Sequence, residues 1–219
     1  MKAWETLGEA PAPDGGTLLL QRRGDEYALR VRGQVLMTSR ARDSERALAA
    51  AATDDARARK LSAPRVLVGG LGLGFTLRAL LDKAPPAARV TVAELSPAVV
   101  GWHRTVLRAL TGDALADPRV DVTVGDVGAL LARSPASAFD AVLLDVDNGP
   151  TALSARENRG LYAPVGLRAA HAALAPGGVY VLWSAGVDAA FLRRMTAAGF
   201  RDARARSCGG RYVLFEGRA

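Results

Sequence analysis

The sequence predicts an α/β protein in which most strands of one central sheet run parallel. From Arg65 onward, short apolar runs alternate with helical segments, and the last two strand-like runs are joined by a tight "CGG" turn. Strands that alternate with helices form right-handed βαβ units, and these units build parallel sheets. The closing hairpin is expected to add one antiparallel strand at the C-terminal end of that sheet.

Length and composition fit this fold class. The chain has 219 residues, which suits one α/β domain with a small addition. No uninterrupted apolar run is long enough to cross a bilayer, so no membrane span is expected. Glu5 and Glu9 stand where a signal peptide would be apolar, and we therefore expect a cytoplasmic location. Cys208 is the single cysteine, which excludes an internal disulfide and a cysteine-based zinc site.

The charge balance is basic. The formal net charge is +7 and the pI is about 10.3. The arginines are scattered singly or in short groups, as in "ARARK" and "RDARAR". This pattern favours a solvated basic surface, or an anionic small molecule, over a nucleic acid as partner.

The N-terminal part predicts a short β-hairpin followed by a helix. The first fifteen residues are rich in Gly and Pro and are expected to be irregular. Ser44 is the expected N-cap of the helix. We divide the chain into an N-terminal hairpin and helix, residues 1–60, and a catalytic domain, residues 61–219. The predicted N-terminal strands are Thr17–Arg22, Tyr27–Val31 and a short Gly33–Met37.

The second part supplies the alternating elements. Its predicted strands are Arg65–Gly70, Arg89–Leu95, Arg119–Asp126, Phe139–Asp147, Val179–Ala185, Arg201–Ser207 and Gly210–Gly217. Its predicted helices are Phe75–Lys83, Ser96–Leu110, Val127–Arg133, Gly160–Leu174 and Val187–Phe200. A hairpin at the end of such a Rossmann-like domain is typical of the class I methyltransferase fold.

A glycine-rich loop follows the first of these strands. Gly70, Gly72 and Gly74 are spaced G-x-G-x-G around Leu73, whereas a dinucleotide loop would place its third glycine one residue later. Glycine lets the backbone turn sharply and approach a ligand, and the following helix N-terminus offers free N–H groups. The spacing is typical of loops that bind S-adenosyl-L-methionine (SAM), and we expect Leu73 to contact that molecule too.

Two acids continue the pattern at the next two strand ends. Glu94, followed by Leu95, is placed to accept both ribose hydroxyls. Asp126 is placed to accept a hydrogen bond from an adenine amino group, with the backbone N–H of Val127 serving the ring nitrogen. Either acid alone can instead be a solvated residue, and Asp126 can be the cap of the helix that follows it. Because ligands bind outside the carboxyl ends of parallel strands, the ordered set predicts a nucleoside site.

Further acids close the fourth buried strand. Asp145 emerges from "AVLL" and is expected to face the sulfonium end of the nucleoside, where it can hold an amine and take its proton. Asp147 is a second candidate catalytic residue. Asp147 and Asn148 are equally compatible with a turn, because these residue types favour turns.

These motifs resemble the spermidine synthase family, a branch of the class I SAM-dependent transferases. The resemblance runs from about Ala41 to the C-terminus and includes "VLVGGLGLGFTLRALL", "VTVAELSPAVV", "DPRVDVTVGD" and "FDAVLLDVDNGP". It implies that Glu94 holds the ribose, that Asp126 holds the adenine, and that Asp145 is the base for an attacking amine. It also implies a homodimer. The chain departs from the family at Leu73, where aminopropyltransferases carry an Asp that anchors the amine of decarboxylated SAM.

Four aromatic or imidazole side chains have open roles. The helix containing Tyr162 resembles the family closely, and Tyr162 is a candidate catalytic residue. Tyr162 and Trp183 are equally compatible with an acceptor pocket and with core packing. His103 and His171 lie in helical patterns and are expected to be structural.

Several functions fit this set of residues. The favoured one is methyl transfer from SAM to a small, nitrogen-bearing acceptor with Asp145 as base. The alternatives are aminopropyl transfer from decarboxylated SAM and a non-catalytic binding module. Metal-dependent methyl transfer would need Asp145, Asp147, Asn148 and a distant Asp188 as ligands, so no metal is expected.

Overall fold

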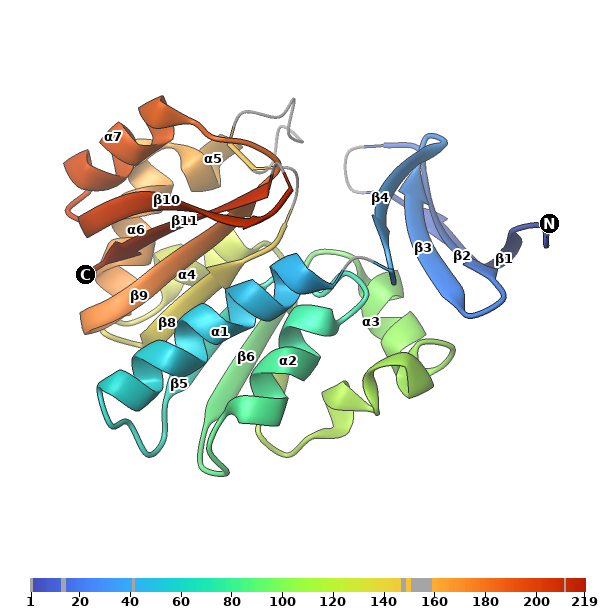
Figure 1. Ribbon diagram of the computed structural model, residues 1–219, viewed down its shortest axis with the longest axis horizontal. Helices are drawn as coiled ribbons and strands as arrows, with labels where there is room; N and C mark the ends of the chain where they lie inside the picture. Colours follow the sequence, from blue (N-terminus) through green and yellow to red (C-terminus); the bar gives the residue numbers. More distant parts are fainter. Residues whose placement is uncertain (1, 13–14, 41, 147–148, 151–158, 211) are drawn as a thin grey trace.

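The computed structural model describes residues 2–12, 15–40, 42–146, 149–150, 159–210 and 212–219 (Figure 1). Within these residues the strands form a four-stranded antiparallel sheet and a seven-stranded sheet. The seven-stranded sheet has the order β10-β11-β9-β8-β5-β6-β7. Its strands are β5 (Arg65–Gly69), β6 (Arg89–Glu94), β7 (Val120–Val124), β8 (Phe139–Leu144), β9 (Leu174–Ser184), β10 (Arg201–Gly209) and β11 (Tyr212–Arg218).

Strand direction confirms the predicted fold class. The neighbours β9, β8, β5, β6 and β7 pair in parallel, whereas β11 runs antiparallel to both β9 and β10. Buried strands of such a sheet have apolar side chains on both faces. The whole of β8, "FDAVLL", is buried, and in β5 Val66 and Val68 enter one core whereas Leu67 enters the other.

Helices cover both faces of the large sheet (Figure 1). The core on one face contains residues of α1, α2 and α3, and the core on the other contains residues of α4, α6 and α7. The helices are α1 (Asp43–Ala58), α2 (Phe75–Lys83), α3 (Pro97–Arg104), α4 (Val127–Arg133), α5 (Arg159–Tyr162), α6 (Pro164–Ala173) and α7 (Ala189–Ala197). Short 3₁₀ turns, Arg108–Thr111 and Ala114–Ala116, follow α3. No described helix is both long and apolar enough to cross a membrane.

The N-terminal sheet is larger than the expected hairpin. Its strands are β1 (Glu5–Pro11), β2 (Thr17–Arg23), β3 (Glu26–Val31) and β4 (Gln34–Thr38). The expectation that the first fifteen residues are irregular was wrong for β1. Gly8 and Pro11 are unusual in central strands, but β1 is an edge strand, and β2 supplies a continuous antiparallel partner from Thr17 to Arg22.

Two predicted helix boundaries were also wrong. Ser44 does not cap α1, because the N-cap is Arg42 and the Ser44 hydroxyl donates to the Glu45 carboxylate instead. The predicted helix Ser96–Leu110 ends at Arg104. There the Thr105 hydroxyl bonds to the Gly101 carbonyl and the Thr105 backbone leaves the helical region. The predicted start of this helix at Ser96 is confirmed, because Ser96 is the N-cap and its side chain accepts from the Val99 N–H.

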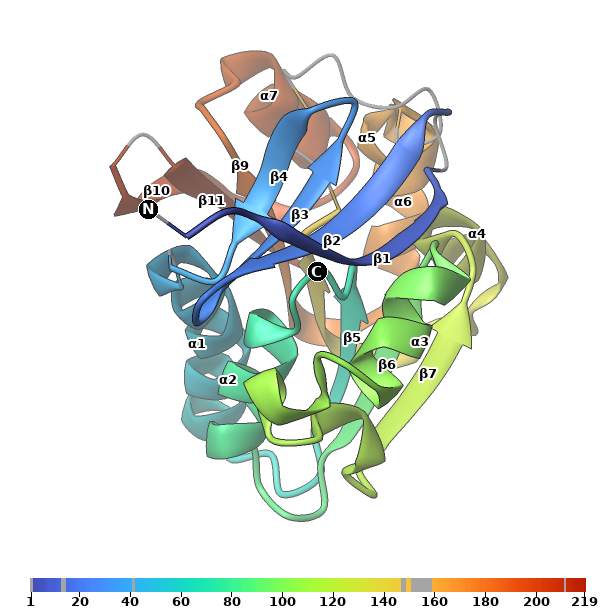
Figure 2. The ribbon, with the colours of Figure 1, turned by 90° about the vertical axis from the view of Figure 1, so that its right-hand side faces the viewer.

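The small sheet lies beyond the carboxyl ends of the parallel strands (Figures 1 and 2). By contrast, α1 packs on α2 and on β8, β9 and β10 of the large sheet. The helix that we grouped with the N-terminal part therefore packs with the second part. The division into domains stays a prediction, and the packing favours a boundary between Thr38 and Asp43.

Candidate active site

The glycine loop joins β5 to α2 with a backbone that requires glycine. Gly70 has a φ of +87° and Gly72 a φ of +50°, a region that other residues rarely adopt. A Cβ on Gly70 would overlap the carbonyl oxygen of Asp145, and a Cβ on Gly72 would lie 2.7 Å from Sδ of Met37. The loop is therefore in contact with the fourth strand end and with the N-terminal sheet. Gly74, with a φ of +81°, is the N-cap of α2.

Glu94 connects this loop to the end of β6. One carboxylate oxygen accepts from the Leu71 N–H and the other from the Ser96 N–H, each at 2.8 Å. Glu94 is only 9% exposed. Burial raises the pKa of its carboxyl group, whereas the hydrogen bonds from backbone N–H groups oppose that rise. Each oxygen has a second lone pair, so a carboxylate held in this way can still accept from a ribose hydroxyl.

Apolar surface lies beside Glu94. Leu95 is 38% exposed and Val124, which pairs with Glu94 in the neighbouring strand, is 51% exposed. Leu95 and Val124 thus expose apolar side chains at two adjacent strand ends, and the contact of Leu95 with a nucleoside stays a prediction. The sequence indicated Leu95 but gave no signal for Val124.

Asp126 caps the helix after β7. Its Oδ1 accepts from the Ala129 N–H at 2.6 Å, so the capping role considered from the sequence is present. Val127 is buried, and its side chain packs against Gly69 at the start of the glycine loop. Asp126 and Val127 thus follow β7 as expected, and their contact with an adenine stays a prediction.

Asp145 lies directly after β8, against the glycine loop. Its backbone N–H donates to the Gly69 carbonyl at 2.8 Å, and its side chain accepts from the Thr76 hydroxyl at 3.3 Å. Thr76 is in the first turn of α2, so this helix and β8 both orient the carboxylate. Sequence reasoning did not identify Thr76, although a hydroxyl one residue after the start of the helix was a usable signal. Asp147 and Asn148 lie outside the described residues.

The aromatic candidates lie in packed surroundings. Tyr162 is 5% exposed, and its ring meets that of Phe191 edge to face at 6.0 Å. Trp183 packs beside Tyr212 with ring centroids 5.2 Å apart. Core packing thus accounts for the placement of the Tyr162 ring, and its catalytic role stays a prediction. Within the described part of the chain, no three His, Cys, Asp or Glu side chains gather as metal ligands would.

Leu73 and His103 support the glycine loop. The Leu73 side chain is fully buried, so only its backbone can meet a ligand. His103 is 2% exposed, and its Nε2 lies 3.0 Å from the Gly72 carbonyl oxygen. Burial lowers the pKa of His103, so the ring is neutral near pH 7 with its proton on Nε2. The expectation that His103 is structural agrees with this placement, but its contact with the loop was not predicted.

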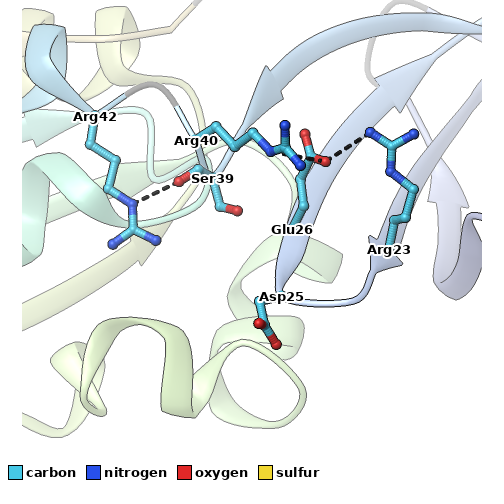
Figure 3. Close-up of a pocket in the computed structure, with 6 residues that line it drawn as sticks. All are labelled: Arg23, Asp25, Glu26, Ser39, Arg40 and Arg42. Carbon is cyan, nitrogen blue, oxygen red and sulfur yellow. Dashed lines mark hydrogen bonds and ion pairs between the residues drawn. The ribbon is translucent and has the colours of Figure 1, made fainter. Parts of the chain in front are cut away.

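A separate cavity of about 310 Å³ lies at the base of the N-terminal sheet (Figure 3). Within it, the buried Glu26 carboxylate lies 2.9 Å from Arg23 and 3.2 Å from Arg40. The glycine loop, Glu94 and Asp145 do not line it, so we assign it to anchoring the sheet. The lining residues are Arg23, Asp25, Glu26, Ser39, Arg40 and Arg42.

Known proteins share this fold and parts of this sequence. No protein-family model matches the chain. A polyamine aminopropyltransferase of Mycobacterium tuberculosis is 34% identical over 169 residues, which cover 75% of this chain and 30% of the relative. A putrescine N-methyltransferase of Nicotiana tabacum is 31% identical over 117 residues, covering 52% of this chain and 28% of the relative. The matched part of the chain thus spans less than a third of the length of these relatives.

The solved structure of spermidine synthase from Thermotoga maritima superposes with a TM-score of 0.75 at 17% identity, covering 97% of this chain and 72% of that one. This likeness extends over the N-terminal sheet as well as the seven-stranded sheet. The likeness in fold, the similarity in sequence to the curated relatives and the order of motifs along the strands all point to one family. The chain belongs to the spermidine synthase-like family.

Proposed function

We propose that this chain is a transferase that moves the aminopropyl group of decarboxylated SAM to an amine acceptor. The observation that carries the proposal is the placement of Glu94 and Asp145 on the two strand ends beside the glycine loop. The aminopropyltransferase relative matches more of the chain, at higher identity, than the methyltransferase relative does. The preference for methyl transfer drawn from the sequence is therefore not confirmed.

The nucleoside part of the substrate fits the residues present. Glu94 would accept the ribose hydroxyls while its bonds to Leu71 and Ser96 keep it in place. Leu95 and Val124 would cover the purine, and Asp126 and Val127 would meet its edge. This arrangement directs the sulfonium end toward Asp145, because Asp145 follows the strand on the other side of β5.

Asp145 would act on the attacking amine. Displacement at the sulfonium forms a bond between the amine nitrogen and a carbon, breaks the bond between that carbon and sulfur, and leaves a neutral thioether. The nitrogen must then lose a proton, and a carboxylate oriented by Thr76 can receive it. Holding the two reactants in line supplies much of the acceleration in such a reaction.

Glu45 is a second acid that we propose for the acceptor part of the site. Burial is the main cause that raises the pKa of the Cys208 thiol; the charge of Arg206 lowers that pKa, and the charges of Asp145 and Glu45 raise it. Both acids are therefore within electrostatic reach of Cys208 on β10. Glu45 is 7% exposed and comes from the first turn of α1. Two acids near one point suit an acceptor with more than one ammonium group, and we propose a polyamine-class acceptor.

Methyl transfer from SAM is the second candidate, and one observation favours it. Leu73 stands where the aminopropyltransferases carry the acid that anchors the aminopropyl ammonium, and its side chain is fully buried. A leucine side chain has no polar group that could bind the aminopropyl ammonium. The similarity to a putrescine N-methyltransferase agrees with this alternative.

Product analysis distinguishes the candidates. The protein is incubated with a diamine and either decarboxylated SAM or SAM, and the nucleoside products are separated by mass spectrometry. We expect 5′-methylthioadenosine to be formed only with decarboxylated SAM and only when Asp145 is intact. S-adenosylhomocysteine formed from SAM would support the second candidate instead. No product with either nucleoside would contradict both and favour a non-catalytic binding module.

A further inference from the structure

One peptide group of the glycine loop is held on both of its sides. The carbonyl of Gly72 and the N–H of Leu73 belong to the same peptide unit. His103 Nε2 donates to that carbonyl at 3.0 Å, and the N–H donates to the sulfur of Met37 at 3.2 Å. Because a peptide unit is planar, these two contacts fix its orientation. Turning it over would break both contacts and leave the buried ring of His103 without this acceptor.

Met37 reaches the loop from the other sheet of the molecule. It lies on β4, where the register shifts at Leu36, so that Met37 pairs with Leu29 and Val35 pairs with Arg30. Leu29 and Arg30 are adjacent on β3 and point to opposite faces, so their partners Met37 and Val35 also point to opposite faces of the small sheet. A Cβ on Gly72 would lie 2.7 Å from the Met37 sulfur and 2.9 Å from its methyl carbon. The thioether thus covers the loop as well as its N–H.

Two other contacts join the small sheet, and the segment that follows it, to helices of the second part. The indole of Trp102, on α3, packs against Gly8 of β1 so closely that a Cβ there would lie 2.7 Å from an indole carbon. The guanidinium of Arg42 lies 4.2 Å above the ring of Phe75, the first residue of α2. The first contact joins β1 to α3, and the second joins the segment after β4 to the start of α2. Met37 therefore lies on a sheet that is held at its first strand and just after its last strand.

We propose that Met37 is a specificity-determining residue that disfavours a sulfonium nucleoside bearing an α-carboxylate, and so selects decarboxylated SAM over SAM. A carboxylate needs N–H donors, and the free N–H groups before a helix are the usual donors in such a loop. Here the Leu73 N–H is already bonded to a neutral thioether, whose methyl group covers the adjacent backbone. SAM must displace Met37 to reach it, whereas decarboxylated SAM has no group that requires this donor.

This inference rests on the proposed function, and binding measurements separate the two. Dissociation constants are measured calorimetrically for SAM, decarboxylated SAM and 5′-methylthioadenosine, which has neither a carboxylate nor an aminopropyl tail. The chains compared are the original, Met37→Ala, Met37→Val and Met37→Leu. Alanine and the shorter, β-branched valine both uncover the N–H, and valine suits a strand, so one is available if the other folds poorly. Leucine keeps the bulk without the sulfur.

We expect the original chain to bind decarboxylated SAM more tightly than SAM by roughly tenfold or more, about the worth of one hydrogen bond to a charged group. Met37→Ala and Met37→Val should reduce this ratio by roughly tenfold through tighter binding of SAM, with 5′-methylthioadenosine unaffected. Met37→Leu should retain most of the discrimination. Val35→Ala, at a 47% exposed position on the opposite face, is the matched control and should leave all three constants unchanged.

An unchanged ratio in both Met37→Ala and Met37→Val overturns the inference, even if the protein makes 5′-methylthioadenosine. Equal loss of affinity for all three nucleosides also overturns it, because that result indicates a merely structural residue. If the original chain binds none of the three, the inference and the proposed function both fail. Aminopropyl transfer with an unchanged ratio leaves the proposed function standing while the role of Met37 is refuted.

Discussion

Replacing Glu94 with Gln tests the two roles that the structure gives this side chain. The carboxylate accepts from Leu71 and Ser96 at 2.8 Å each, and an amide has only one oxygen to offer. One of the two N–H groups must then face an NH₂ group. A hydrogen bond to a charged group contributes about 1.5–3 kcal/mol. The amide avoids the cost of burying a charge, which is the cause of the raised pKa of Glu94, so we expect the low end of that range.

The expected loss of folding free energy is therefore about 1.5 kcal/mol, which corresponds to roughly 3–6 °C in Tm for a chain of this size. The affinity for 5′-methylthioadenosine should fall by roughly 10- to 100-fold, because the ribose hydroxyls lose a charged acceptor. Scanning calorimetry measures the first effect and titration calorimetry the second.

The exposed Glu9 provides a matched control. Glu9→Gln removes the same charge without burial and should change the folding free energy by less than about 0.5 kcal/mol. If Glu94→Gln bound the nucleoside as tightly as the original chain, the ribose would be held elsewhere. If its Tm were unchanged, the hydrogen bonds that the Glu94 carboxylate accepts from the backbone would not stabilise the fold.

Three further substitutions test the loop and the base. Gly70→Ala should destabilise the fold by about 1–3 kcal/mol more than Gly33→Ala. Both positions have positive φ, but only Gly70 also meets a backbone oxygen, and equal losses in urea unfolding would contradict this contact. Asp145→Asn should leave nucleoside affinity within about twofold while abolishing most turnover, and an active variant would remove the base. For His103, the lowered folded pKa means that the unfolded chain binds more protons below about pH 6.5. Stability should therefore fall as the pH drops below about 6.5, more steeply than in His103→Gln, and parallel pH profiles would refute this.

The order of strands and helices was predictable because local patterns determine it. The run "FDAVLL" is apolar except for Asp140 because β8 is buried on both faces, and Pro97 after Ser96 marks the start of α3. Helix ends were less predictable. The sequence offered Ser44 as a cap, but the chain enters α1 from β4 at Arg42, whose guanidinium bonds the Ser39 carbonyl and lies over Phe75. Contacts between segments distant in sequence decided that boundary.

The positions of the candidate acids were predictable because each lies at the carboxyl end of an apolar strand, and their roles in a site stay predictions. Glu94 and Asp145 are placed by this rule alone, although the sequence did not reveal that Glu94 also binds the loop backbone. Met37 and His103 were not predictable as loop contacts. Met37 lies 36 positions before Leu73, on a separate sheet, and only the docking of that sheet brings its sulfur to the loop. A homodimer stays a prediction, since the contacts described here are all within one chain.

Several arginines form ion pairs with buried acids. Arg204 and Arg206 on β10 both pair with the buried Glu216, at 2.7 Å each. Asp55 on α1 pairs with Arg59 at 3.3 Å and also with Arg218. These four arginines therefore neutralise buried acids, and Arg218 also joins α1 to a C-terminal strand. That a nucleic acid is not a partner stays a prediction.

The most direct test of the nucleoside site is a crystal structure of the chain with 5′-methylthioadenosine. We expect electron density for the ribose with its hydroxyls on the Glu94 carboxylate, the purine against Leu95 and Val124, and the thioether sulfur on the side of Asp145. Density for the nucleoside at any other surface, with the Glu94 carboxylate still bonded only to Leu71 and Ser96, would contradict the account.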